Sequence, residues 1–104
     1  MNTSITPKIV KQTGSFNRLI MAVSVKNVSL DAVVEIASPL TASSTDLIQL
    51  NDSSVYPYNG SALNFYNKSN KTFYQAYVST AGMISVLSPI PAGSYMLNGF
   101  WISK

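Results

Sequence analysis

The stretch FYQAYVSTAGMISVLSPIPAGSYMLNGFWISK, residues 73–104, decides the fold of this chain. Phe73–Ser79 and Met83–Leu87 are rich in aromatic and β-branched residues, and they flank a short turn that ends at Gly82. Because glycine tolerates the positive φ that tight hairpin turns require, this part of the chain is predicted to form a β-hairpin. After a proline-containing connection, Tyr95–Ser103 is predicted to form one more strand.

Neither face of that last predicted strand is polar. Successive side chains point to opposite faces of a strand, and an antiparallel sheet with one solvated face alternates apolar with polar residues. One face of Tyr95–Ser103 carries Tyr95, Leu97 and Trp101, and the other carries Met96, Phe100 and Ile102. The second face therefore needs cover, either from a second sheet or from another copy of the chain.

The rest of the chain repeats the same pattern of short β-rich runs separated by turn residues. Strands are predicted at Ile5–Lys11, Arg18–Lys26, Ala32–Ile36, Leu47–Leu50, Ala62–Tyr66, Phe73–Ser79, Met83–Leu87 and Tyr95–Ser103. Short strands at this spacing predict an all-β fold, a small antiparallel β-barrel or two-sheet sandwich of about eight strands. The length of 104 residues fits a single domain, residues 1–104.

Two turns and one ambiguous segment complete the local predictions. Thr13–Ser15 is expected to join the first two strands as a hairpin, and Asn27–Ser29 is expected to form a turn. Leu30–Ile36 also has apolar residues at helical spacing, with Ser29 as a possible cap. Its two valines and the nearby Pro39 favour a strand instead.

The composition argues against several classes of function. Only 11% of the residues are charged, and the seven basic ones are scattered: Lys8, Lys11, Arg18, Lys26, Lys68, Lys71 and Lys104. Dispersed lysines do not make a nucleic-acid surface, so no nucleic-acid partner is expected. The longest apolar run, Leu19–Val23, is too short to span a bilayer, so no membrane insertion is expected. The chain has no Cys and no His, which removes disulfides, thiolate metal sites and the commonest general base.

The acidic residues give no clear catalytic or metal site. Asp31, Glu35, Asp46 and Asp52 all lie within one short segment. Glycosidases need two carboxylates on opposing sides of a sugar, and Asp31 and Glu35 approach each other only if their segment is helical. Oxygen ligands at Asp46, Asn51 and Asp52 suit calcium in type, but their spacing matches no known calcium loop. We therefore expect no catalytic residue, no metal and no cofactor.

Aromatic residues interleaved with amides are the strongest signal for binding. An aromatic ring offers apolar contact to the flat face of a sugar, and neighbouring amides donate and accept hydrogen bonds with its hydroxyls. The candidate saccharide-binding residues are Gln75 and Tyr77 for hydrogen bonds, Tyr74 or Trp101 for stacking, and Tyr58 and Asn59 at the rim. The alternative is that most of these rings fill the core, which applies above all to Trp101 among its apolar neighbours.

Several segments together resemble a known family. They are Lys11–Phe16 followed by Leu19–Val25, the Tyr74–Val78 strand with its turn at Gly82 and Met83–Leu87, the Gly93–Tyr95 element, and the end at Lys104. Over nearly its whole length the chain resembles the C-terminal head domain of receptor-binding proteins from lactococcal siphophages. In this comparison the first two segments correspond to the opening hairpin of the head and the next two to its later hairpin.

The resemblance implies a non-enzymatic viral adhesin. It implies a homotrimer of short β-barrels at the tail tip of the virion, forming the C-terminal part of a longer phage protein attached to the baseplate. The partner it implies is a host cell-wall polysaccharide, bound near the subunit interface. Some members carry a His-x-Asp pair, a Trp and a C-terminal Arg in that pocket. At the corresponding positions this chain has Gln75, Tyr77 and Leu87, and its C-terminal region contains no arginine. The pocket chemistry therefore differs from theirs.

Two other classes of function fit parts of the sequence. A structural virion protein, such as a decoration or tail module without a saccharide ligand, accounts equally well for the second apolar face. A carbohydrate-active enzyme would depend on Glu35 or on one of the aspartates.

Overall fold

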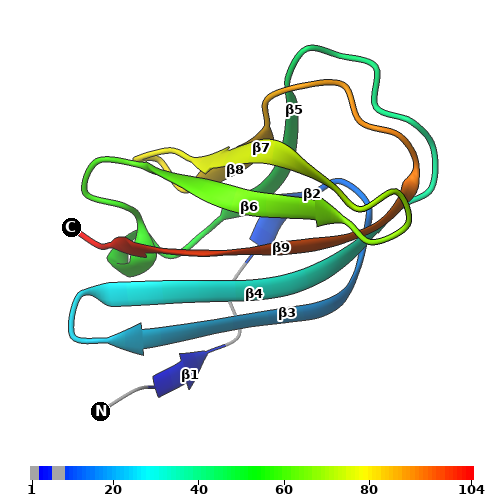
Figure 1. Ribbon diagram of the computed structural model, residues 1–104. Helices are drawn as coiled ribbons and strands as arrows, with labels where there is room; N and C mark the ends of the chain where they lie inside the picture. The colour runs from blue at the N-terminus through cyan, green and yellow to red at the C-terminus, as the bar shows by residue number, and fades with distance from the viewer. Residues whose placement is uncertain (1–2, 6–8) are drawn as a thin grey trace.

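The computed structural model describes residues 3–5 and 9–104, and within them the chain is almost entirely β-structure (Figure 1). The strands are β1 (Thr3–Ile5), β2 (Ile9–Gln12), β3 (Ser15–Ser24), β4 (Asn27–Ile36), β5 (Thr45–Leu50), β6 (Ser61–Asn67), β7 (Thr72–Val78), β8 (Met83–Val86) and β9 (Gly93–Ile102). One 3₁₀ turn, η1 (Ser53–Val55), follows β5. The prediction of an all-β fold is confirmed. In the described part of the chain no helix is long and apolar enough to cross a membrane.

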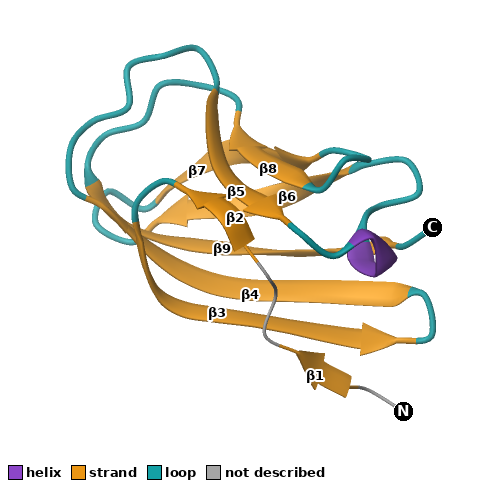
Figure 2. Ribbon diagram, turned by 180° about the vertical axis from the view of Figure 1, so that it is seen from behind, coloured by secondary structure: helices purple, strands orange, loops and turns teal. Residues whose placement is uncertain are grey.

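The nine strands of the described residues belong to one antiparallel sheet with the order β1-β3-β4-β9-β6-β7-β8-β5-β2. The sheet curls, so that β2, β5 and β8 lie across from β3, β4 and β9 as in an open barrel (Figure 2). The inner face of the curl holds the core, whose largest fully buried side chains include Tyr95, Phe65, Met21 and Leu97. The opposite, outer face is open to solvent.

The C-terminal stretch forms the predicted hairpin and strand. β7 and β8 pair antiparallel, with Tyr77 opposite Ser85, and the turn between them places Gly82 at a φ of 77°. A side chain at Gly82 would collide with the ring of Tyr56, a second reason for glycine here. β9 does not extend this hairpin, because it lies at the middle of the sheet between β4 and β6.

The structure also corrects predictions near the N-terminus. β2 pairs with β5, whereas β3 pairs with β1 and β4, so Thr13–Ser15 does not close a hairpin. Gly14, at a φ of 86°, instead makes a corner that carries the chain from one side of the curl to the other. The predicted strand Ile5–Lys11 contains residues 6–8, which lie outside the described residues. Leu30–Ile36 is confirmed as strand, within β4.

The two faces of β9 differ in burial as its alternation requires. Tyr95, Leu97 and Trp101 point into the core, and the indole N–H of Trp101 donates a 2.7 Å hydrogen bond to the carbonyl of Val55 in η1. Phe100 and Ile102 point outward with 76% and 54% of their surface exposed. In a single chain the second apolar face is therefore uncovered.

The turn between β3 and β4 contains a strained residue and yields a stability prediction. The predicted turn at Asn27–Ser29 is wrong, because β4 already starts at Asn27 and pairs it with Ser24. The turn residues are Val25 and Lys26, and Val25 has a φ of 58° with 89% of its surface exposed. A positive φ is costly for a β-branched residue, and two-residue hairpin turns favour glycine there.

Val25→Gly is expected to raise the free energy of unfolding by about 1 kcal/mol. The left-handed conformation costs an L-residue about 1–2 kcal/mol, and the extra chain entropy of glycine offsets part of the gain. Urea unfolding measures the change. Lys26→Gly is the matched control at a position without positive φ and is expected to lower stability. A loss of stability in Val25→Gly would contradict the assigned turn conformation.

A second prediction concerns Tyr95. Its ring is fully buried and stacked on Phe65 with 4.4 Å between centroids, and its hydroxyl donates to the carbonyl of Pro91. Burial raises the pKa of Tyr95 above its ordinary value, an effect reduced by a hydrogen bond with Asn67 and reinforced by Tyr74. The folded chain therefore retains this proton at a pH where the unfolded chain has lost it.

Stability is therefore expected to fall as the pH rises beyond about 10, the ordinary pKa of tyrosine. Below that pH both states keep the proton, so the contribution of Tyr95 is constant. Urea unfolding between pH 8 and pH 11 measures the slope. Tyr95→Phe is expected to flatten it while lowering stability at pH 8, because the bond to Pro91 is lost. An equally steep slope in Tyr95→Phe would contradict this assignment.

Candidate functional site

The outer face of β9, β6 and β7 carries amides and aromatic rings in adjacent rows. Asn64 of β6 lies opposite Asn98 of β9 on one side and opposite Gln75 of β7 on the other. Because alternate residues share a face, Phe100 follows Asn98 on this face, and Phe73 and Tyr77 lie on either side of Gln75. We call these six residues the amide–aromatic patch: Asn64, Phe73, Gln75, Tyr77, Asn98 and Phe100.

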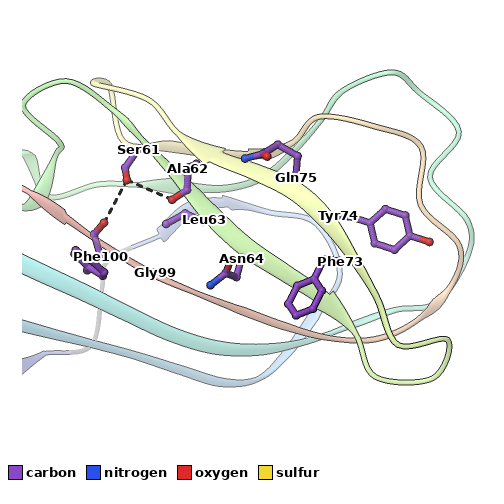
Figure 3. Close-up of a pocket in the computed structure, with 9 residues that line it drawn as sticks. All are labelled: Ser61, Ala62, Leu63, Asn64, Phe73, Tyr74, Gln75, Gly99 and Phe100. Carbon is purple, nitrogen blue, oxygen red and sulfur yellow. Dashed lines mark hydrogen bonds between the residues drawn. The ribbon is translucent and has the colours of Figure 1, made fainter.

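An open hollow of about 550 Å³ lies within this patch (Figure 3). Phe100 borders it at one end and Phe73 at the other, with Asn64 between them on β6 (Figure 3). The remaining residues that line it are Ser61, Ala62, Leu63, Tyr74, Gln75 and Gly99. Phe73 exposes 69% of its surface, so both end rings are accessible.

The local sequence of β6 and β9 explains why a hollow forms here. β6 points Leu63 and Phe65 into the core and Ala62 and Asn64 outward. Ala62 is too small to fill the space beside the ring of Phe100. Gly99 alternates with Phe100, and an added Cβ there would point inward and lie 2.4 Å from Cδ2 of the buried Leu63. The small outward side chain of Ala62 thus leaves the ring of Phe100 exposed.

The patch is polar but uncharged. The side-chain amide of Asn64 donates to the Oδ1 of Asn98 at 3.2 Å, and the Gln75 amide donates to the carbonyl of Ala76. Each of these amides carries further donor or acceptor capacity, since a carboxamide has two N–H groups and two lone pairs. None of the described residues that line the hollow is charged. This chemistry suits a neutral ligand with hydroxyl groups.

A second hollow of about 470 Å³ lies on the other side of Phe100. Tyr58, Asn59 and Gly60 form its loop side, and Phe100 and Ile102 of β9 form its strand side. Tyr58 exposes 66% of its surface, and its backbone N–H donates to the carbonyl of Ile102 at 2.8 Å. The loop is therefore held against β9, next to the amide–aromatic patch.

Four of the six sequence-predicted site residues lie on this surface. Gln75 and Tyr77 are exposed and belong to the amide–aromatic patch, and Tyr58 and Asn59 line the second hollow. Phe100 lines both hollows, so it lies between Gln75 and Tyr77 on one side and Tyr58 and Asn59 on the other.

The two residues predicted to stack on a sugar are packed mainly into the core, although Tyr74 also lines the first hollow and Trp101 the second. Tyr74 alternates with Gln75 and faces inward, where its ring meets that of Tyr95 edge-on with 6.1 Å between centroids. Its hydroxyl accepts a hydrogen bond from Asn70. Trp101 is 4% exposed and donates its indole N–H to Val55. The exposed rings on this surface are instead those of Phe73 and Phe100.

Phe73 and Phe100, the exposed rings at the ends of the hollow, were not among the candidate residues predicted from the sequence. The exposed position of Phe73 could have been predicted, because Phe73, Gln75 and Tyr77 are two residues apart along one strand and therefore share a face. Phe100 was recognised as outward but was assigned to the second apolar face in need of cover. Asn98 alternates into the same face as Phe100, but its position beside Asn64 follows only from the register between β9 and β6.

The four carboxylates are dispersed, and each has a local partner. Asp31 forms a 2.8 Å ion pair with Arg18, Glu35 accepts from Asn17, Asp46 accepts from Ser85, and Asp52 caps η1 by accepting from the backbone N–H of Ser54. Over residues 3–5 and 9–104, no group of three or more acidic side chains lies close enough to hold a metal ion.

Comparison with known protein families and with curated proteins finds no match to this chain.

Proposed function

We propose that this chain is the head domain of a phage tail-tip adhesin that binds a saccharide of the host cell wall without catalysis. The observation that carries the proposal is the hollow between Phe73 and Phe100, with the amides of Asn64 and Gln75 within it. Exposed rings bind the C–H faces of sugars, and amides exchange hydrogen bonds with hydroxyls. The resemblance to lactococcal phage head domains supplies the biological context.

The proposal includes assembly into a homotrimer attached to upstream parts of the same protein at the baseplate. Ile20 of β3 and Met96 and Ile102 of β9 expose apolar side chains on the outer face, beside the patch. Ile102 lies next to the exposed rings of Phe100 and Tyr58, and exposed apolar side chains grouped in this way are typical of protein contacts, which supports a seam between identical subunits here. Three linked sites compensate for weak binding at each one through avidity.

The direct test is binding of the purified protein to host cell-wall polysaccharide, measured by isothermal titration calorimetry. Gln75→Ala, at a residue that lines the hollow, is expected to weaken binding, and so is Tyr77→Ala, at the exposed ring next to it on the same face of β7. Circular dichroism is expected to show that both variants remain folded. Thr41→Ala, in an exposed loop remote from β7 in sequence, is the control and is expected to bind like the parent. A folded parent protein that binds no host polysaccharide would contradict the proposal.

The second candidate is a structural virion protein without a ligand. The exposed Phe100 and Ile102 favour it, because apolar side chains on a subunit surface also fit virion assembly. Oligomers in light scattering together with no saccharide binding would support this candidate. If the chain were instead a carbohydrate-active enzyme, it would slowly release saccharide from the polysaccharide. We expect the polysaccharide to remain unchanged after long incubation.

A further inference from the structure

The two exposed rings of the amide–aromatic patch lie at opposite ends of one hollow, which raises the question of ligand length. Phe100 on β9 lies two residues beyond Asn98, the partner of Asn64. Phe73 on β7 lies opposite Tyr66, two residues beyond Asn64 in the other direction. The two rings are therefore four residues apart along the strands and two strands apart across the sheet.

This register places the two Cα atoms about 17 Å apart, taking about 3.4 Å per residue and about 4.8 Å between strands. A single sugar ring covers one aromatic face, so it cannot contact Phe73 and Phe100 together. The space between the rings is floored by Ala62 and carries the side chain of Asn64, with Gln75 beside it. The hollow thus offers a ring at each end and hydrogen-bonding groups in the middle (Figure 3).

We propose that the site binds an extended neutral oligosaccharide of at least three rings, which lies diagonally across β9, β6 and β7. One sugar stacks on Phe100, the next is held by Asn64 and Gln75, and a third stacks on Phe73. This inference rests on the proposed function, because it specifies the ligand of the same surface.

The charge distribution supports a neutral chain. None of the described residues lining either hollow is charged. Asp31 lines an adjacent hollow with Asn98 and Phe100, and its ion pair with Arg18 balances its charge. An anionic polymer would find no cation among the residues that line the two hollows to offset the loss of its hydration. Aromatic contact and amide hydrogen bonds therefore carry the recognition.

The test uses size-fractionated oligosaccharides obtained by partial acid hydrolysis of the cell-wall polysaccharide that the protein binds. Affinity is expected to rise about tenfold from the monosaccharide to the trisaccharide, because a second aromatic face is engaged. It is expected to change little between 50 mM and 500 mM NaCl, since salt screens only charged contacts. Equal affinity for the monosaccharide and the trisaccharide, or a steep fall with salt, would overturn the proposal.

Phe73→Ala separates the two ends of the hollow. Its side chain is exposed, so the variant is expected to fold, although the contact with Tyr66, at 4.6 Å between ring centroids, is lost. It is expected to lower trisaccharide affinity about tenfold and monosaccharide affinity by no more than about twofold, because a single sugar can still stack on Phe100. A loss of the same size for both ligands would overturn the three-ring arrangement. Failure of the parent protein to bind any polysaccharide would instead refute the proposed function itself.

Discussion

Trp101→Ala is expected to lower the free energy of unfolding by about 3–5 kcal/mol, the usual loss when a buried large aromatic is truncated. Trp101 is 4% exposed and packs in the core on the inner face of β9. Its indole N–H satisfies the carbonyl of Val55, which anchors η1 to the sheet. Because small domains are stable by only about 5–15 kcal/mol, the variant is expected to be close to unfolding at ambient temperature.

Two further variants separate the causes of this loss. Trp101→Phe keeps an aromatic ring but leaves the Val55 carbonyl without its donor, for which we expect a loss of about 1–3 kcal/mol. Phe100→Ala, one residue earlier on the outer face, is expected to change stability by no more than about 0.5 kcal/mol. Urea unfolding measures all three. Equal losses at positions 100 and 101 would contradict the assigned faces of β9.

Phe100→Ala is expected to weaken binding of cell-wall polysaccharide by about tenfold or more, as the second large effect. Burying an aromatic side chain against an apolar surface contributes about 1.5–3 kcal/mol when complete, and each 1.4 kcal/mol corresponds to a factor of ten. Phe100 borders both hollows, so its removal affects a ligand in either. Calorimetric titration of the parent and variant with the same polysaccharide measures the change.

Leu87→Ala is the matched control for Phe100→Ala. Leu87 is also an exposed apolar residue, but it follows β8 and does not line either hollow. It is expected to bind like the parent. If Phe100→Ala remains folded and binds as tightly as Leu87→Ala, Phe100 is not a contact residue and the site lies elsewhere.

Local patterns predicted the strands well and their neighbours poorly. The alternation along Tyr95–Ser103 correctly separated the buried Tyr95, Leu97 and Trp101 from exposed Phe100. That alternation does not predict that β9 pairs with β4 and β6. Strand partners that are far apart in sequence are selected by the packing of the whole sheet. For the same reason Thr13–Ser15 resembled a hairpin turn, although it forms a corner.

The candidate site was predictable in part. Gln75 and Tyr77 were chosen because aromatic and amide residues alternate there, and both are exposed on one surface, as residues two apart on a strand are expected to be. The same rule assigns Tyr74 to the other face, with the buried Ala76, so its inward position follows from parity alone. The pairing of Phe73 with Phe100 around one hollow was not predictable, because it depends on the register between β9, β6 and β7.

The central position of β9 has a consequence for how the chain acquires its structure. β9 is the last strand in chain order, yet it pairs along the whole length of β4 and also with β6. Until β9 pairs with them, β4 and β6 remain separated and their apolar inner faces stay exposed to solvent. Contacts between segments so distant in sequence are slow to form. We therefore expect cooperative folding on the millisecond-to-second scale, in which β3 and β4 do not reach their native structure before β9 pairs with β4.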